Sequence, residues 1–172
     1  MAVDRRVVVR RGAVLQYALL GAAVLGMRWS GGVLGAAVAA AAVVSAVLLS
    51  VVVHEGAHAW VAHRLGLRVR GVEVRGLLAA VVRRAATTDA RVDVRVRLAG
   101  PLATGALVAL CVAAQRVGWP PDALRIVRLL IALNGFTFVA TLMGGPQSDG
   151  VRAWRAWRAA RRAVGDRRPQ RA

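Results

Sequence analysis

The chain has 172 residues, of which 58% are hydrophobic, and its mean hydropathy is +0.54, whereas a soluble domain of this size is usually about 45–50% apolar. Its net charge is +17, and all 25 basic residues are arginine. A nucleic-acid partner would explain such a charge. Long apolar segments separate the arginines, however, and no nucleic-acid-binding motif is present, so we expect no such partner. The single cysteine excludes an intrachain disulfide.

The apolar residues lie in blocks, as membrane-spanning helices of about 20 residues require. Residues 13–27 form a short block after several arginines, which fits a signal peptide or a short first span. We favour a span, because no small-residue cleavage site with a mature domain follows. The second block, residues 33–63, begins with 21 uncharged residues and then carries His54, Glu55 and His58. Ionisable groups in such a position are costly, which makes them candidates for function.

Residues 64–97 differ in kind, because valine and arginine alternate in several places. Alternation with a period of two is typical of strands that have one apolar and one solvated face. We therefore expect a small β element at the membrane surface between the second and third spans. The acidic residues within it, Glu73, Asp89 and Asp93, are expected to have ordinary surface roles.

Two further spans are expected at residues 98–114 and 124–143, followed by an irregular loop that contains glycine and proline. The tail, residues 151–172, carries Trp154 and Trp157 three residues apart among arginines. This pattern favours an amphipathic helix at the membrane interface, although a merely solvated basic tail is an alternative.

These elements predict an all-α polytopic membrane protein with about four transmembrane helices in a single domain, residues 1–172. Four arginines precede residue 13, nine lie within 64–97 and eight follow Gly150, which makes 21 of the 25. The positive-inside rule then places both termini and residues 64–97 in the cytoplasm, with the chain in the plasma membrane.

His54-Glu55-Gly56-Ala57-His58 is an HExxH motif. Residues four apart share one face of a helix, so both imidazoles can bind one Zn²⁺ ion, while Glu55 acts as general base towards the bound water. A purely structural alternative is that the two histidines cap the end of a span. That alternative does not explain why the carboxylate of Glu55 lies next to them.

A catalytic zinc site usually has a third protein ligand, often a carboxylate. The other acidic residues lie in the alternating region, in the basic termini or in the turn on the opposite side of the membrane. Asp149 remains, at the cytoplasmic end of the fourth span. Asp149 lies in an irregular loop, and irregular backbone within the depth of the membrane is tolerated where it is buried in protein or lines a water-filled cavity.

The chain resembles the site-2 protease family of intramembrane zinc metallopeptidases over roughly residues 33–162. HExxH in a transmembrane helix, a glycine-proline motif at Gly100 and Pro101, and an Asp-Gly pair at Asp149 and Gly150 follow in the family's order. The resemblance implies a zinc-dependent metalloendopeptidase that cleaves a membrane protein or transmembrane peptide in or near its spanning part.

The resemblance also implies that Asn134, Gly100, Pro101 and Pro146 shape the site or bind substrate, and that an edge of the 64–97 strands receives extended substrate. The family often has asparagine where this chain has Thr104 and Thr141. These departures leave open a non-catalytic zinc protein, such as a pseudoprotease or a regulator. A small metal transporter that uses the histidines is a further alternative.

Overall fold

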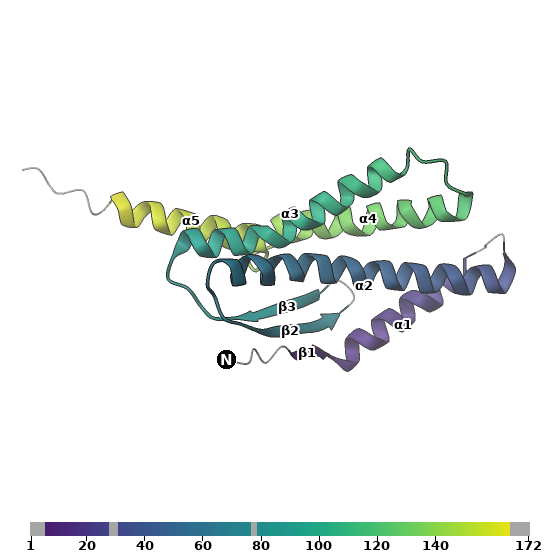
Figure 1. Ribbon diagram of the computed structural model, residues 1–172, viewed down its shortest axis with the longest axis horizontal. Coiled ribbons are helices and arrows are strands. Elements are labelled where there is room, and N and C mark those ends of the chain that lie inside the picture. The colour runs from purple at the N-terminus through teal and green to yellow at the C-terminus, as the bar shows by residue number, and fades with distance from the viewer. Residues whose placement is uncertain (1–5, 28–30, 77–78, 166–172) are drawn as a thin grey trace, which may run out of the picture.

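The computed structural model describes residues 6–27, 31–76 and 79–165 (Figure 1). The described chain is mostly helical and includes one three-stranded sheet. The elements are β1 (Arg6–Val9), α1 (Arg11–Leu25), α2 (Gly32–Arg64), β2 (Val69–Gly76), β3 (Ala79–Arg84), α3 (Ala90–Ala114), α4 (Pro121–Met143) and α5 (Asp149–Gly165). Within the predicted domain 1–172, the link at residues 28–30 and the end of the tail, 166–172, lie outside the described residues.

Helices α2, α3 and α4 are each long and apolar enough to cross a membrane. Helix α1 has 15 residues and is therefore only about 22 Å long at 1.5 Å per residue, less than the roughly 30 Å of a hydrocarbon core. Three of the four predicted spans thus have a helix of spanning length in the described chain, and residues 13–27 correspond to a shorter apolar helix.

The apolar core lies between α1 and the first half of α2. Small side chains on α2, among them Ala36, Ala39 and Ala40, are buried, and Tyr17 and Val24 of α1 pack against them. Larger apolar side chains such as Val33, which is 87% exposed, point away from the protein. A helix that is apolar on all sides is typical of a membrane span, where lipid covers the outward face.

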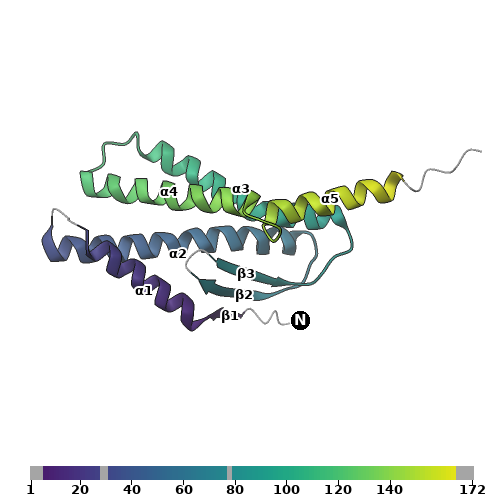
Figure 2. The same cartoon turned by 180° about the vertical axis from the view of Figure 1, so that it is seen from behind.

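The sheet has the strand order β1-β2-β3, with β1 parallel and β3 antiparallel to β2. Figures 1 and 2 show the β2–β3 hairpin alongside the second half of α2, and β3 packs against that helix. Register shifts between β2 and β3 occur next to Gly71 and Gly76. Strand β1 was not predicted, because its partner lies more than sixty residues away in the chain.

The end of the predicted β element is wrong, because residues 91–97 form the first turns of α3. Asp89 caps the helix: its carboxylate accepts hydrogen bonds from the backbone N–H groups of Arg91 and Val92, at 2.8 and 3.3 Å. Asp93 then pairs with Arg97 one turn later at 2.7 Å. Capping therefore overrides the alternation, and the predicted span 98–114 is the later part of a longer helix.

Glu73 does not have the surface role that we expected, because its side chain is only 2% exposed. Three arginines surround its carboxylate: Arg10 at 2.5 Å, Arg75 at 3.1 Å and Arg83 at 2.8 Å. Hydrogen bonds from Arg75, Arg83 and Arg10 lower the pKa of Glu73 to about 2. Because Arg10 follows β1, this cluster ties the N-terminal strand to the hairpin.

Helix α5 has the amphipathic character predicted for the tail. Ala153 is buried, and α5 packs against α3. Trp154 and Trp157 are exposed and stack on each other, with ring centroids 4.8 Å apart. Figures 1 and 2 show α5 running along the long axis of the molecule and past the end of α2.

Candidate metal centre

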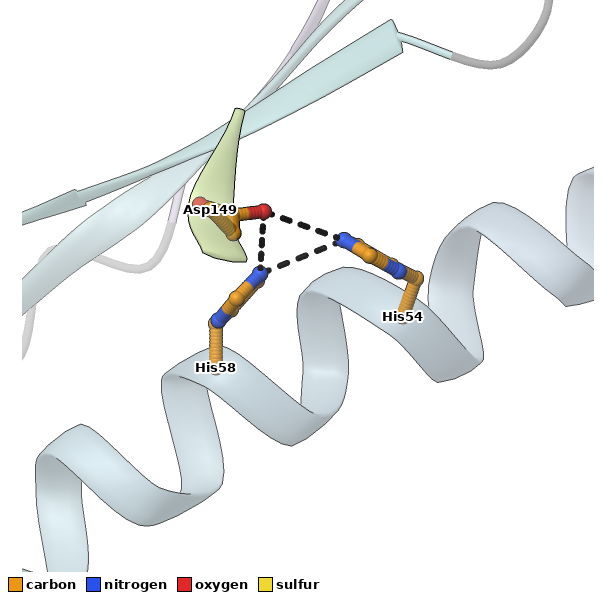
Figure 3. A group of neighbouring side chains, drawn as sticks. All are labelled: His54, His58 and Asp149. Atoms are coloured by element: carbon orange, nitrogen blue, oxygen red, sulfur yellow. Dashed lines mark hydrogen bonds and ion pairs between the residues drawn. The ribbon is translucent and has the colours of Figure 1, made fainter. Parts of the chain in front are cut away.

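Helix α2 presents His54 and His58 on one face, and the start of α5 brings Asp149 over them (Figure 3). The two Nε2 atoms are 3.2 Å apart. Asp149 Oδ2 lies 3.6 Å from Nε2 of His54 and 3.4 Å from Nε2 of His58. The three ligand atoms all lie within 4.8 Å of one another, so the three residues predicted as ligands are together in space and could hold a metal ion.

Hydrogen bonds at the far side of each ring determine where its proton lies. Nδ1 of His58 donates to the backbone carbonyl of Val96 at 2.6 Å. The Thr104 hydroxyl donates to the Gly100 carbonyl at 3.2 Å, so it accepts from Nδ1 of His54, 2.8 Å away. Each ring is therefore protonated at Nδ1 and presents the lone pair of Nε2 to the centre. Hydrogen-bond partners of metal-binding histidines fix the tautomer and the ring orientation in the same way.

The arrangement consequently directs two lone pairs and one carboxylate oxygen at the same point. Burial raises the pKa of Asp149, but hydrogen bonds and charge attraction from the protonated rings of His54 and His58 outweigh this and hold that pKa below its usual range. Asp149 is thus a carboxylate at neutral pH. When both rings are neutral, neither Nε2 atom nor the Asp149 carboxylate oxygen carries a hydrogen, so their lone pairs repel one another. A bound cation removes this repulsion.

Gly100 determines how closely α3 approaches the histidines. A Cβ atom at this position would lie 2.3 Å from Nε2 of His58 and 2.6 Å from Nε2 of His54. Only glycine leaves room at the metal centre. Its neighbour Pro101 is fully buried inside α3, so Pro101 contributes to helix packing rather than to the ligand set.

Asp149 reaches the centre through a tight loop after α4. Gly145 has φ of +127°, a conformation that favours glycine. A Cβ on Gly150 would lie 2.3 Å from the Leu142 carbonyl oxygen, so the chain folds directly back on the end of α4. Pro146 lies in this loop, where its carbonyl accepts a hydrogen bond from Arg155 at 3.2 Å.

Two cavities meet at the metal centre. The first, of about 110 Å³, has a neutral polar lining that includes Ser50, Thr104, Asn134, Thr137 and Thr141. Asn134 is 3% exposed, and its Nδ2 donates to the Leu130 carbonyl at 2.9 Å. The predicted site residue Asn134 thus lines the same cavity as His54 and Asp149, as does Thr141.

The second cavity, of about 350 Å³, lies on the side of β3 and the arginines. Glu55 and Asp149 line both cavities. Glu55 is only 8% exposed and lies beside the backbone amide of Val82 in β3. It does not belong to the cluster of three ligand atoms, so its carboxylate is available to a molecule bound in either cavity.

Two functional groups were not assigned from the sequence. Thr104 was noted only as a departure from the family pattern, although its position four residues after Gly100 places it on the same face of α3. The Val96 carbonyl could not be assigned from the sequence, because every residue type has the same backbone carbonyl.

Comparisons with known proteins identify no relative, since no protein-family model, curated protein or solved structure matches the chain.

Proposed function

We propose that the chain is an intramembrane zinc metallopeptidase of the site-2 protease type, which hydrolyses a peptide bond in or near the membrane-spanning part of a substrate protein. The observation that carries the proposal is the convergence of His54, His58 and Asp149 beside the buried carboxylate of Glu55. The residues fit the ion, because two imidazoles and one carboxylate form a common catalytic zinc set that leaves a fourth position open.

The spacing of the ligand atoms supports zinc. Tetrahedral coordination with bonds of about 2.0–2.1 Å separates neighbouring ligand atoms by about 3.3 Å. The observed separations of 3.2, 3.4 and 3.6 Å lie around this value. Magnesium and calcium prefer sets made of oxygen atoms, which two imidazoles do not provide.

Glu55 supplies the acid–base chemistry in this proposal. When bound, zinc acts as a Lewis acid towards the substrate carbonyl and lowers the pKa of water. The Glu55 carboxylate takes one proton from the attacking water, whose oxygen forms the new bond to the carbonyl carbon. It then delivers this proton to the amide nitrogen as the C–N bond breaks, so that Glu55 ends the cycle as a carboxylate.

Strand β3 supports an extended substrate conformation. It is at one edge of the sheet, and its residues line both cavities beside the metal centre. A substrate segment that pairs with such an edge satisfies its backbone hydrogen bonds as it leaves the helical state. The peptide bond next to Glu55 and Asp149 would then be presented in an accessible form.

The arginines support a topology with both termini in the cytoplasm. Strands β2 and β3, the start of α3 and helix α5 lie at one end of the molecule, and the α3–α4 connection lies at the other (Figures 1 and 2). Most arginines belong to the first end, which we therefore place in the cytoplasm. In this arrangement α1 is a short fourth span, and the metal centre lies near the cytoplasmic side of the membrane.

The test uses purified full-length protein in detergent, with metal content and peptide hydrolysis measured on the same samples. Glu55→Gln should keep about one zinc per chain and lose activity by about 10²–10⁴-fold. Asp149→Ala should lose zinc itself, because a ligand is gone. His63→Ala is the control, since His63 is exposed and lies outside the cluster. Full activity in Glu55→Gln would refute the peptidase mechanism, and zinc without any hydrolysis would indicate a non-catalytic protein.

A further inference from the structure

The two cavities that meet at the metal centre differ in charge. Apart from Glu55, Asp149 and His54, which belong to the centre, the first cavity is lined by neutral residues. The second cavity is lined by Arg84, Arg97 and Arg152 in addition to the residues of the centre. A chain that crosses the metal centre along β3 therefore passes from a neutral surface to a strongly basic one.

The arginines of the second cavity are not neutralised by their surroundings. Arg84 and Arg97 share a single carboxylate, that of Asp93, at 2.5 and 2.7 Å. Their side chains are only 15% and 18% exposed, so they are held in place at the cavity wall. Arg152 is more exposed than these two arginines, and its side chain forms no ion pair with another described residue.

Three positive charges thus face one negative charge at the wall of this cavity. Glu55 and Asp149 add two negative charges at the metal centre, and a bound divalent cation offsets both of them. The charge balance at the cavity wall is then unchanged. Guanidinium groups bind carboxylates through paired hydrogen bonds, and such contacts are strong where water is partly excluded. An uncompensated basic cavity beside a catalytic centre is therefore suited to an anionic group of the substrate.

We propose that the second cavity binds a carboxylate of the substrate peptide on the cytoplasmic side of the scissile bond, and that Arg152 is the residue that selects it. The inference rests on the proposed peptidase function. The carboxylate belongs either to an aspartate or glutamate side chain or to a free C-terminus. In both forms the carboxylate fixes the peptide along β3. The uncharged part of the peptide then lies in the first cavity, and the metal centre lies between the two cavities.

Binding is measured first, without any need for catalysis. The probe is a synthetic apolar peptide that carries one glutamate, moved stepwise along the sequence, and its matched glutamine and lysine versions. Zinc-loaded Glu55→Gln protein is titrated with each labelled peptide by fluorescence anisotropy. At one register the glutamate peptide should bind about tenfold more tightly than the glutamine peptide, as expected for a charge-assisted hydrogen bond. A C-terminal acid and its amide, compared in the same way, distinguish the two sources of the carboxylate.

The variant Arg152→Gln in the same background should remove this tenfold preference. Arg158→Gln is the matched control, because it makes the same charge change on α5 at an exposed residue that lines neither cavity. Equal affinity for glutamate and glutamine peptides at every register overturns the proposal, as does a preference that survives in Arg152→Gln. Loss of the preference in Arg158→Gln as well would show that net charge alone is responsible, and it also overturns the proposal.

Two further outcomes are decisive. Anionic lysolipid that displaces the peptide whether or not the peptide carries a carboxylate would assign the cavity to a lipid headgroup and overturn the proposal. Cleavage assays with active protein then separate this inference from the proposed function. A carboxylate preference in binding without zinc-dependent cleavage supports the cavity assignment and refutes the peptidase, whereas cleavage that ignores the carboxylate does the reverse.

Discussion

The hydroxyl oxygen of Thr104 lies 2.8 Å from Nδ1 of His54, and it receives the proton of that ring because its own hydrogen is donated to the Gly100 carbonyl. Thr104 therefore selects the His54 tautomer that turns a lone pair towards Asp149. The carbonyl of Val96 does the same for His58. The orientation of His54 thus depends on a side chain and can be altered by mutation, whereas that of His58 depends on the backbone.

Replacing Thr104 with valine should weaken metal binding without unfolding the protein. Valine has nearly the same shape but cannot accept the proton of Nδ1, so the His54 ring is free to rotate or change tautomer. Loss of such a partner typically lowers metal affinity by about 10–100-fold. Competition with a zinc chelator measures the change, and Thr104→Ser should restore the affinity. Equal affinity in Thr104→Val would mean that the hydroxyl does not orient the ring.

Two glycine-to-alanine substitutions near the histidines should have opposite effects. In Gly100→Ala, the new methyl group would lie 2.3 Å from Nε2 of His58, so zinc binding should be abolished. In Gly56→Ala, inside the HExxH motif itself, a Cβ meets nothing within 4 Å. Alanine there should preserve zinc binding and stabilise α2 by about 0.5–1 kcal/mol. Zinc content and thermal unfolding of the two proteins provide the comparison, and full zinc occupancy in Gly100→Ala would contradict the packing described here.

The topology can be tested with single cysteines at the two ends of the molecule. In a Cys111→Ser background, Gly118→Cys lies in the α3–α4 connection and Arg158→Cys lies on α5. A membrane-impermeant maleimide should label the first cysteine in intact cells and the second only after lysis. Labelling of Arg158→Cys from outside would reverse the orientation that the arginine distribution predicts.

The helices and the shared face of His54 and His58 were predictable from the sequence because both depend on local patterns. Long apolar blocks determine α2 and α4, and the i, i+4 spacing of His54 and His58 places them on one face of a helix. Asp149 was identified because few acidic residues were available in the chain. Each of these inferences uses residues close together in sequence or a short list of candidates.

The errors share a different cause, since each depends on a contact between distant segments or on a single capping residue. Residues 91–97 alternate as a strand does, but Asp89 starts a helix there. Glu73 looks solvated in the sequence, and only the pairing of β1 with β2 brings Arg10 to it. The roles of Gly100 and Thr104 likewise depend on the packing of α3 against α2, which no local pattern specifies.

The Glu73 cluster makes the stability of the sheet depend on pH in a defined window. The carboxyl has a pKa of about 2 in the folded protein and 4.5 as its ordinary value. Folding lowers this pKa, so the cluster stabilises the folded state fully above about pH 4.5, and the stabilisation is lost as the pH falls towards 2. At neutral pH the three arginines hold the N-terminal strand through this one carboxylate.

Glu73→Gln should therefore lower the thermal unfolding temperature at pH 7, because three guanidinium groups lose their common partner while remaining close together. The difference from the unmodified protein should shrink as the pH is lowered through the window between the two pKa values, where the native carboxyl also becomes neutral. Thermal unfolding in detergent at a series of pH values measures this. Arg70→Gln, which removes an exposed charge from β2 outside the cluster, should leave the pH dependence unchanged. If Glu73→Gln and the unmodified protein keep the same separation in unfolding temperature down to about pH 2, the carboxylate does not stabilise the sheet in the way proposed.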